Sequence, residues 1–188
     1  MRKKGRLFII SAPSGCGKTT IVKKLLRQVK NLTPSISITT RAKRAGEKKQ
    51  KDYHYISRRS FKGKVKNRYF LEWEENFGEF YGTPKKFADD TIGCGKDVLL
   101  TIDVKGAGVV KKKVPSAVRI FLKPPSMKEL SNRLKNRKTE QEAEVAKRLT
   151  VAKKELEAAK KYDYVVTNKK LDTAVKRIVS IIKKERKG

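Results

Sequence analysis

The sequence predicts an α/β fold in which helices cover both faces of a parallel β-sheet, giving three layers. Two observations lead to this prediction. Short apolar runs of strand length alternate with segments whose apolar residues recur every three or four positions. Such alternation is typical of parallel strands joined by crossover helices. At 188 residues the chain is long enough for one substantial hydrophobic core.

The first predicted element is an apolar strand at 7–11, followed by a Gly-rich turn and an amphipathic helix near 18–30. Capping-box patterns at Ser126 with Glu129 and at Thr139 with Glu142 mark the starts of two later helices. The remaining core elements are predicted as strand 98–103, helix 104–113, strand 117–122, helices 127–137 and 140–160, strand 164–167 and a last helix from about 172.

The stretch from about 35 to 91 interrupts this alternation. It contains four short runs rich in aromatic and β-branched residues, closely spaced along the chain. We therefore expect a small, mostly antiparallel lobe inserted into the core. Pro84 is expected to open a short helix after it. The runs lie at 35–40, 53–56, 70–74 and 77–81.

The turn after the first strand has the composition of a phosphate-binding loop. Gly15 and Gly17 allow backbone N–H groups to surround phosphate oxygens, and the next helix adds its free donors and positive dipole end. Lys18 is placed to reach the outer phosphates of ATP, and the Thr19 hydroxyl to bind Mg²⁺. The predicted ATP contacts of this loop are Ser14, Gly15, Cys16, Gly17, Lys18, Thr19 and Thr20.

One position of this loop departs from the usual pattern, because Ala12 stands where the first glycine is common. The alternative interpretation is a Gly-rich strand–helix turn with a chance Lys-Thr pair. The flanking strand and helix favour a nucleotide site instead. Cys16 lies at a helix N-terminus, where a thiol pKa can be lowered, although we expect it to act as a filler residue.

The formal net charge is +30, with 49 lysines and arginines against 19 acids. A nucleic-acid partner is therefore an alternative to consider. However, the cations are spread along the chain, without a long basic tail or a recognition motif. Polyanionic substrates need some of them, and we expect the rest to be solvated surface that permits non-specific contact with RNA. No apolar run reaches membrane-spanning length and the two cysteines cannot form a disulfide framework, so we expect a cytoplasmic protein.

The inserted lobe carries an ordered series of polar motifs: Thr39-Thr40-Arg41 with Arg44 and Gly46-Glu47, then Lys51-Asp52-Tyr53, Glu72-Trp73 and Tyr81-Gly82-Thr83. Together with the phosphate-binding loop, this series resembles guanylate kinase, the nucleoside monophosphate kinase that phosphorylates GMP with ATP. The resemblance extends from residue 7 to about residue 171.

The chemistry of these residues agrees with that resemblance. Arginines and tyrosines suit a phosphate acceptor. The Glu72 carboxylate can accept from both N1–H and the 2-amino group of guanine, whereas adenine lacks the N1 donor and would leave the carboxylate unpaired. Hydroxyls of Ser37 and Thr83 can bond the guanine O6 atom. The predicted GMP-binding residues are Ser37, Arg41, Arg44, Tyr53, Glu72, Tyr81, Thr83 and Asp103.

Further roles follow from the resemblance. Asp103 ends an apolar strand and would lie near Mg²⁺, through water, and near the acceptor. Thr101 and Lys105 stand where the family usually has Asp and Gln, and Lys138 where it often has Gly. Arg133 and Asn168 would contact ATP, and a helical lid would bring arginines to the transferring phosphoryl group. The catalytic residues implied are Lys18, Arg44, Arg137 and Arg148.

We therefore expect ATP-dependent phosphorylation of GMP, and also of dGMP, with Mg²⁺ as cofactor. The expected organisation is a phosphate-loop core at 1–34, 92–125 and 151–188, a GMP-binding lobe at 35–91 and a lid at 126–150. Two alternatives come from other classes: a non-catalytic guanylate-kinase-like binding domain, and a basic protein that binds nucleic acid. The sequence does not indicate an oligomeric state.

Overall fold

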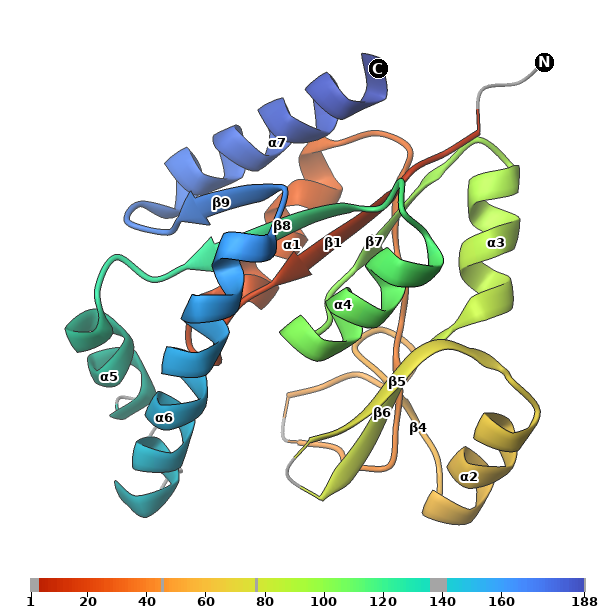
Figure 1. Cartoon of the computed structure of the whole chain (residues 1–188), viewed down its shortest axis with the longest axis horizontal. Coiled ribbons are helices and arrows are strands. Elements are labelled where there is room, and N and C mark those ends of the chain that lie inside the picture. The colour runs from red at the N-terminus through yellow and green to blue at the C-terminus, as the bar shows by residue number, and fades with distance from the viewer. Residues whose placement is uncertain (1–3, 45, 77, 136–141, 188) are drawn as a thin grey trace.

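The core of the molecule is a five-stranded parallel sheet in a computed structural model that describes residues 4–44, 46–76, 78–135 and 142–187 (Figure 1). The strand order is β2-β7-β1-β8-β9, and every neighbouring pair is parallel. The strands are β1 (Leu7–Ser11), β2 (Leu32–Pro34), β7 (Asp97–Leu100), β8 (Val118–Lys123) and β9 (Tyr164–Thr167).

Both faces of this sheet are covered, as the apolar pattern predicts. Alternate residues of β1 point to opposite faces, so Phe8 and Ile10 join one buried cluster while Leu7 and Ile9 join another. Helices α1 (Lys18–Gln28) and α7 (Leu171–Lys187) pack on the first face. Helices α4 (Val104–Lys113) and α3 (Lys85–Gly93) pack on the second. The predicted three-layer α/β fold is confirmed.

A second sheet forms the inserted lobe, with strand order β4-β3-β6-β5. The β3–β6 and β5–β6 pairs are antiparallel and β3–β4 is parallel, so the prediction of a mostly antiparallel lobe holds. The lobe has its own small core, in which the Phe61 ring stacks on those of Phe70 and Phe80. Its elements are β3 (Ile38–Thr39), β4 (His54–Tyr55), α2 (Arg58–Lys66), β5 (Phe70–Asn76) and β6 (Glu79–Pro84).

Helices α5 (Met127–Lys135) and α6 (Glu142–Ala158) lie below the core sheet at the left of Figure 1, with the lobe at the right. The Ser126 hydroxyl oxygen accepts from the Glu129 N–H at 3.1 Å, which is the bond expected of a capping box. The second capping box includes Thr139, which lies outside the described residues. A short 3₁₀ turn, η1 (Ala159–Lys161), connects α6 toward β9. None of the helices in the described part of the chain could cross a membrane.

Several boundaries differ from the predictions. Strand β7 ends at Leu100 rather than at residue 103, because Asp103 leaves the sheet to cap the N-terminus of α4. Helix α1 ends at Gln28, since Val29 is already extended. Pro84 ends β6 and is the N-cap residue of α3, one position before its first helical residue. Strand β2 and helix α2 were not among the predicted elements.

Candidate active site

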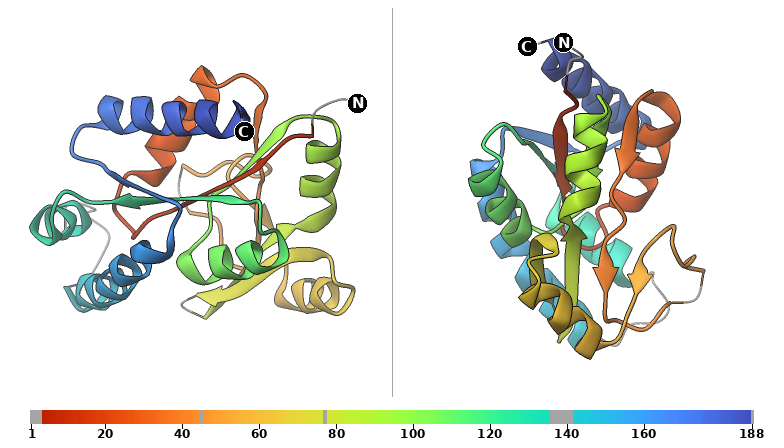
Figure 2. Two further views of the ribbon diagram at one scale, coloured as in Figure 1. Left: turned by 45° about the horizontal axis from the view of Figure 1, so that its top comes forward. Right: turned by 90° about the vertical axis from the view of Figure 1, so that its right-hand side faces the viewer.

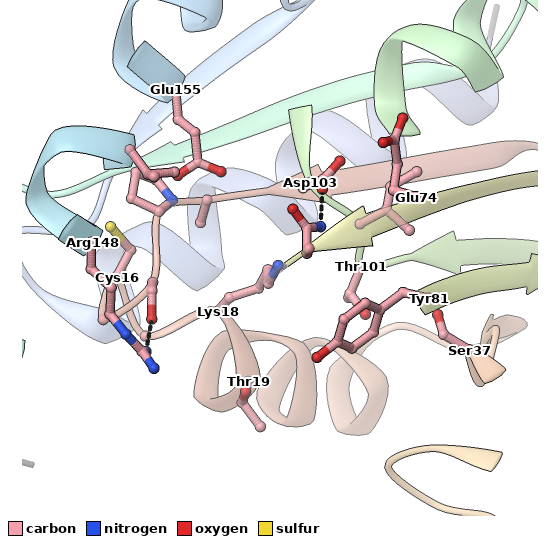
Figure 3. A pocket seen from close by; sticks show the side chains of 18 of the residues that line it. Cys16, Lys18, Thr19, Ser37, Glu74, Tyr81, Thr101, Asp103, Arg148 and Glu155 are labelled. Carbon is pink, nitrogen blue, oxygen red and sulfur yellow. Dashed lines mark hydrogen bonds between the residues drawn. The ribbon is translucent and has the colours of Figure 1, made fainter. Parts of the chain in front are cut away.

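A cleft of about 400 Å³ lies beyond the carboxyl ends of β1 and β7, between the lobe and α6 (Figure 3). This edge of a parallel sheet is where α/β proteins commonly bind ligands. The cleft is lined by the phosphate-binding loop, by strand ends of the lobe and by one face of α6. The predicted site residues that line it are Ser14, Gly15, Cys16, Gly17, Lys18, Thr19, Thr20, Ser37, Arg44, Tyr53, Glu72, Tyr81, Asp103 and Arg148.

The phosphate-binding loop has a backbone that requires glycine. Gly15 and Gly17 have φ angles of 88° and 80°, in the left-handed region that side chains disfavour. Gly17 is also the N-cap residue of α1, so the loop leads directly into a helix N-terminus. The buried Asn168 side chain supports the loop from behind, donating to the Cys16 carbonyl at 2.9 Å. Asn168 therefore contacts the loop without lining the cleft.

Lys18 is the first residue of α1, and its side chain extends toward Asp103 across the cleft (Figure 3). Burial lowers the pKa of Lys18, and the nearby carboxylates of Glu155 and Asp103 oppose that shift. Arg148 of α6 donates to the Ser14 hydroxyl at 3.0 Å, which brings a second cation to the loop. The cleft thus places two cationic side chains beside backbone donors, an arrangement suited to a polyphosphate.

The Cys16 thiol does not have the lowered pKa that a helix N-terminus can produce. Its side chain is completely buried among apolar residues of the core. Burial raises the pKa of the thiol to about 12, so the thiol is not activated. The side chain packs in the core, and only the backbone of this residue is suited to a phosphate.

The opposite wall of the cleft holds a buried pair on adjacent strands of the lobe. Thr83 of β6 lies opposite Glu72 of β5, and its hydroxyl donates to Glu72 Oε1 at 2.5 Å. Burial raises the pKa of Glu72 to about 7, although the Thr83 bond favours the carboxylate. A Cβ on Gly106 would lie 2.6 Å from Glu72 Oε2, so the close approach of α4 requires glycine there.

A second polar group lies at the rim of the lobe, centred on Glu47. Arg41 donates to its Oε1 atom at 2.7 Å, while the Arg44 N–H and the Tyr55 hydroxyl donate to Oε2 at 2.8 Å. Although burial opposes ionisation, these bonds lower the pKa of Glu47 to about 2. The Arg41 guanidinium lies 5.4 Å from the centre of the Tyr53 ring. Glu47 therefore orders Arg41 and the backbone of Arg44.

Asp103 is held by both the core and the lobe. Its Oδ1 atom accepts from the Gly106 N–H at 2.8 Å, which caps α4. Its Oδ2 atom accepts from the Asn76 side chain at the end of β5. Among the described residues, no group of three His, Cys, Asp or Glu side chains is arranged to hold a metal ion.

The structure also brings residues into the cleft that the sequence did not indicate: Glu74, Asn76, Val151 and Glu155. Thr101, where the family usually has Asp, lines the cleft as well. Glu155 lies on the same face of α6 as Arg148, seven residues away, and burial raises its pKa to about 7. The seven-residue spacing from Arg148, which puts the two charged residues on one face of α6, was the available signal. The Asn76 contact depends on the tertiary fold and has no local signal.

Four predicted site residues lie outside the lining of the cleft. Thr83 is behind Glu72, Arg41 is at the Glu47 rim and Asn168 is behind the loop. Arg133 pairs with Glu129 on its own helix at 2.9 Å. Arg137 and Lys138 lie outside the described residues.

The guanylate kinase family model matches residues 4–185 of this chain. A guanylate kinase from Caldanaerobacter subterraneus subsp. tengcongensis is 47% identical over 99% of this chain and 90% of its own length. One from Thermotoga maritima is 46% identical over 97% of this chain and 88% of its own length. The crystal structure of guanylate kinase from Anaplasma phagocytophilum superposes with a TM-score of 0.82 at 34% identity, covering 98% of this chain and 88% of that one. The chain therefore belongs to the guanylate kinase family.

Proposed function

We propose that this chain, as a guanylate kinase, transfers the terminal phosphoryl group of ATP to GMP in the cleft described above. The observation that supports this most directly is that the two facing walls of the cleft carry different chemical groups. One wall carries the phosphate-binding loop with Lys18, and the other carries the buried Glu72–Thr83 pair with Ser37 and Tyr81. One cleft thus combines donors for a polyphosphate with acceptors for a guanine base.

We assign base recognition to Glu72 and Ser37, with Thr83 holding the Glu72 carboxylate from behind. When ionised, the Glu72 carboxylate accepts the two guanine donors, and Thr83 already holds one of its oxygens in place. The GMP phosphate would be bound by arginines and tyrosines at the Glu47 rim. Those residues are Arg41, Arg44, Tyr53 and Tyr81.

Phosphoryl transfer needs positioning and charge stabilisation more than a general base, because the attacking phosphate oxygen is already ionised. We assign the stabilisation of charge on the transferring group to Lys18, Arg44 and Arg148, together with Arg137 from the sequence. Arg148 already reaches Ser14 of the loop. A lid at 126–150 would close on joint binding of both nucleotides, moving Arg137 and Arg148 onto the phosphates.

The residues present fit a magnesium ion bound together with ATP. Thr19 offers an exposed hydroxyl at the helix start, and Asp103 offers a carboxylate across the cleft, both hard oxygen donors. When bound with ATP, the ion neutralises phosphate charge. Because Gly106 and Asn76 hold both Asp103 oxygens, contact through water suits Asp103 better than direct coordination.

The non-catalytic alternative is not favoured, since the chain retains Lys18, Gly17 and Thr19 in the cleft and resembles enzymes over nearly its whole length. We test the proposed function by measuring ADP release with Mg-ATP and each of GMP, dGMP, AMP, CMP and UMP. We expect GMP to give the highest kcat/KM, dGMP to be accepted and AMP to be rejected strongly. Equal turnover of AMP and GMP would contradict the assignment of Glu72.

A further inference from the structure

Strand β5 carries a polar side chain to which the proposed function gives no role. Because successive residues of a strand point to opposite faces, Glu72, Glu74 and Asn76 lie on one face of β5. All three line the cleft, whereas Trp73 and Glu75 of the other face do not. The strand that carries the proposed base-recognition residue Glu72 therefore also presents Asn76 to the cleft.

Helix α4 of the core lies beside β5, as Figure 1 and Figure 2 show. Near the start of the strand, the Lys113 ammonium at the end of α4 donates to the Leu71 carbonyl at 2.6 Å. At the end of the strand, the Asn76 amide donates to Asp103, the N-cap residue of α4. The strand and the helix therefore run in opposite directions and are joined at both ends.

The two spans have similar lengths, so both contacts can form at once. The chain from Leu71 to Asn76 extends about 17 Å as a strand, and the chain from Asp103 to Lys113 rises about 15 Å as a helix. Leu71 is buried in the core cluster beneath α4, whereas Asn76 is only half-buried. At the Asn76 end, the bond to Asp103 therefore joins the lobe to the core by side chains alone.

The contact with Asp103 requires a donor without negative charge. Glu72 and Glu74 already bring two acids to this face of β5. Burial raises the pKa of both, and the negative charge of Asp103 adds to the shift. A third acid at position 76 would repel Asp103 and would have no proton to donate at neutral pH. The Asn76 amide is neutral and donates through its NH2 group, so it stabilises the Asp103 carboxylate.

The orientation of Asp103 affects the phosphate-binding loop. The Lys18 side chain extends toward Asp103 across the cleft (Figure 3). The Gly106 N–H holds one Asp103 oxygen from the core, and Asn76 holds the other from the lobe. Without Asn76, the second oxygen would be free to accept from the Lys18 ammonium, in competition with the phosphates of ATP.

We propose that Asn76 is a positioning residue for phosphoryl transfer. It holds the second oxygen of Asp103, which leaves Lys18 available to the phosphates, and it fixes the end of β5 against α4. This inference rests on the proposed function, because Lys18 belongs to the machinery assigned there. It adds that a side chain of the lobe controls the orientation of a side chain in the core.

The test compares N76A with E75A, which truncates the exposed neighbour on the other face of β5. A third variant, D103S, keeps an oxygen that can cap α4 but lacks the second oxygen that Asn76 holds. The double variant N76A/D103S completes a cycle that shows whether Asn76 acts through Asp103. For each variant, kcat and the KM values for ATP and GMP are measured, and calorimetry checks that the protein is folded.

We expect N76A to lower kcat/KM for ATP about tenfold, the scale of one lost hydrogen bond to a charged group. The GMP KM should change less than about threefold, and E75A should match the parent chain. In the D103S background, removing Asn76 should cost less than about twofold, because the oxygen through which it acts is already absent. If N76A does not fold, the isosteric N76D variant, which loses the donor and adds repulsion, should lower kcat/KM for ATP by at least the same factor.

Three results would overturn the proposal. The first is a kcat/KM for ATP in N76A equal to that of E75A, which would leave Asn76 a purely structural role. The second is an equal loss on removing Asn76 from the parent chain and from D103S. The third is a raised GMP KM with kcat/KM for ATP unchanged, which would make Asn76 a direct GMP contact. None of these results alters the turnover of GMP by the parent chain, which tests the proposed function separately.

Discussion

Replacing Glu72 with Gln should make the folded protein more stable at alkaline pH while weakening its binding of GMP. Glu72 is 4% exposed, and burial raises the pKa of its carboxyl from 4.5 to about 7. A raised pKa means that the folded state favours the protonated carboxyl. Protonation of Glu72 therefore contributes to the free energy of unfolding. This contribution is fully present below pH 4.5 and is lost as the pH rises through 7. The difference corresponds to about 3 kcal/mol at pH 8.

Gln is neutral at every pH and retains an oxygen that can accept the Thr83 hydroxyl. The E72Q variant should therefore unfold at a temperature roughly 6–12 °C above that of the parent chain at pH 8. At pH 5 the parent carboxyl is itself protonated in the folded state, so most of the difference should vanish. Differential scanning calorimetry at the two pH values measures both quantities. The matched control is E75Q, at an exposed position of the same strand.

The same substitution should raise the GMP KM by about 10- to 150-fold, because one charge-assisted bond of about 1.5–3 kcal/mol is lost. The ATP KM should change much less, because ATP docks at the loop on the other wall. A variant that is no more stable than the parent chain at pH 8, or that binds GMP equally well, would refute the assignment of Glu72 as a buried carboxylate that reads the base.

Three further predictions concern the same cleft. In the parent chain, kcat/KM for GMP should fall about tenfold per pH unit below pH 7, because a protonated Glu72 cannot accept both guanine donors. An equally steep fall in E72Q would assign the titration to another group. N168A should lose the bond to the Cys16 carbonyl, reduce the free energy of unfolding by about 1 kcal/mol and raise the ATP KM, as calorimetry and kinetics would show. R148A should lower kcat more than either KM, whereas a purely structural Arg148 would leave kcat intact in single-turnover measurements.

Much of the fold could be predicted because its elements follow local rules. The apolar strand β1, the glycines of the loop and the amphipathic faces of α1 and α7 each have a strong local pattern. Strand β2 was missed because three residues ending in Pro34 are too few to show the alternating apolar pattern of a strand. Helix α2 was missed because it buries only one residue completely, Phe61, and contains Gly63 in its interior.

Two cleft residues could be predicted for different reasons: Lys18 from the local Gly-Lys-Thr pattern, and Glu72 from the family resemblance of the lobe motifs. The supporting contacts could not, because they join segments far apart in the chain. Asn76 meets Asp103 through the packing of the lobe on α4, and Asn168 meets the loop across the sheet. The ionisation of Glu72 and Glu155 also depends on burial, which only the assembled cleft provides.

We propose that phosphoryl transfer depends on the loop that ends at Lys18, facing the lobe that is proposed to bind GMP. The most direct test is the rate of ADP formation from Mg-ATP and GMP by K18A, compared with K23A, which removes an exposed lysine of the same helix. We expect K18A to lose at least about 100-fold in kcat while it still binds GMP in calorimetry, and K23A to match the parent chain. Turnover of K18A close to that of K23A would contradict the claim.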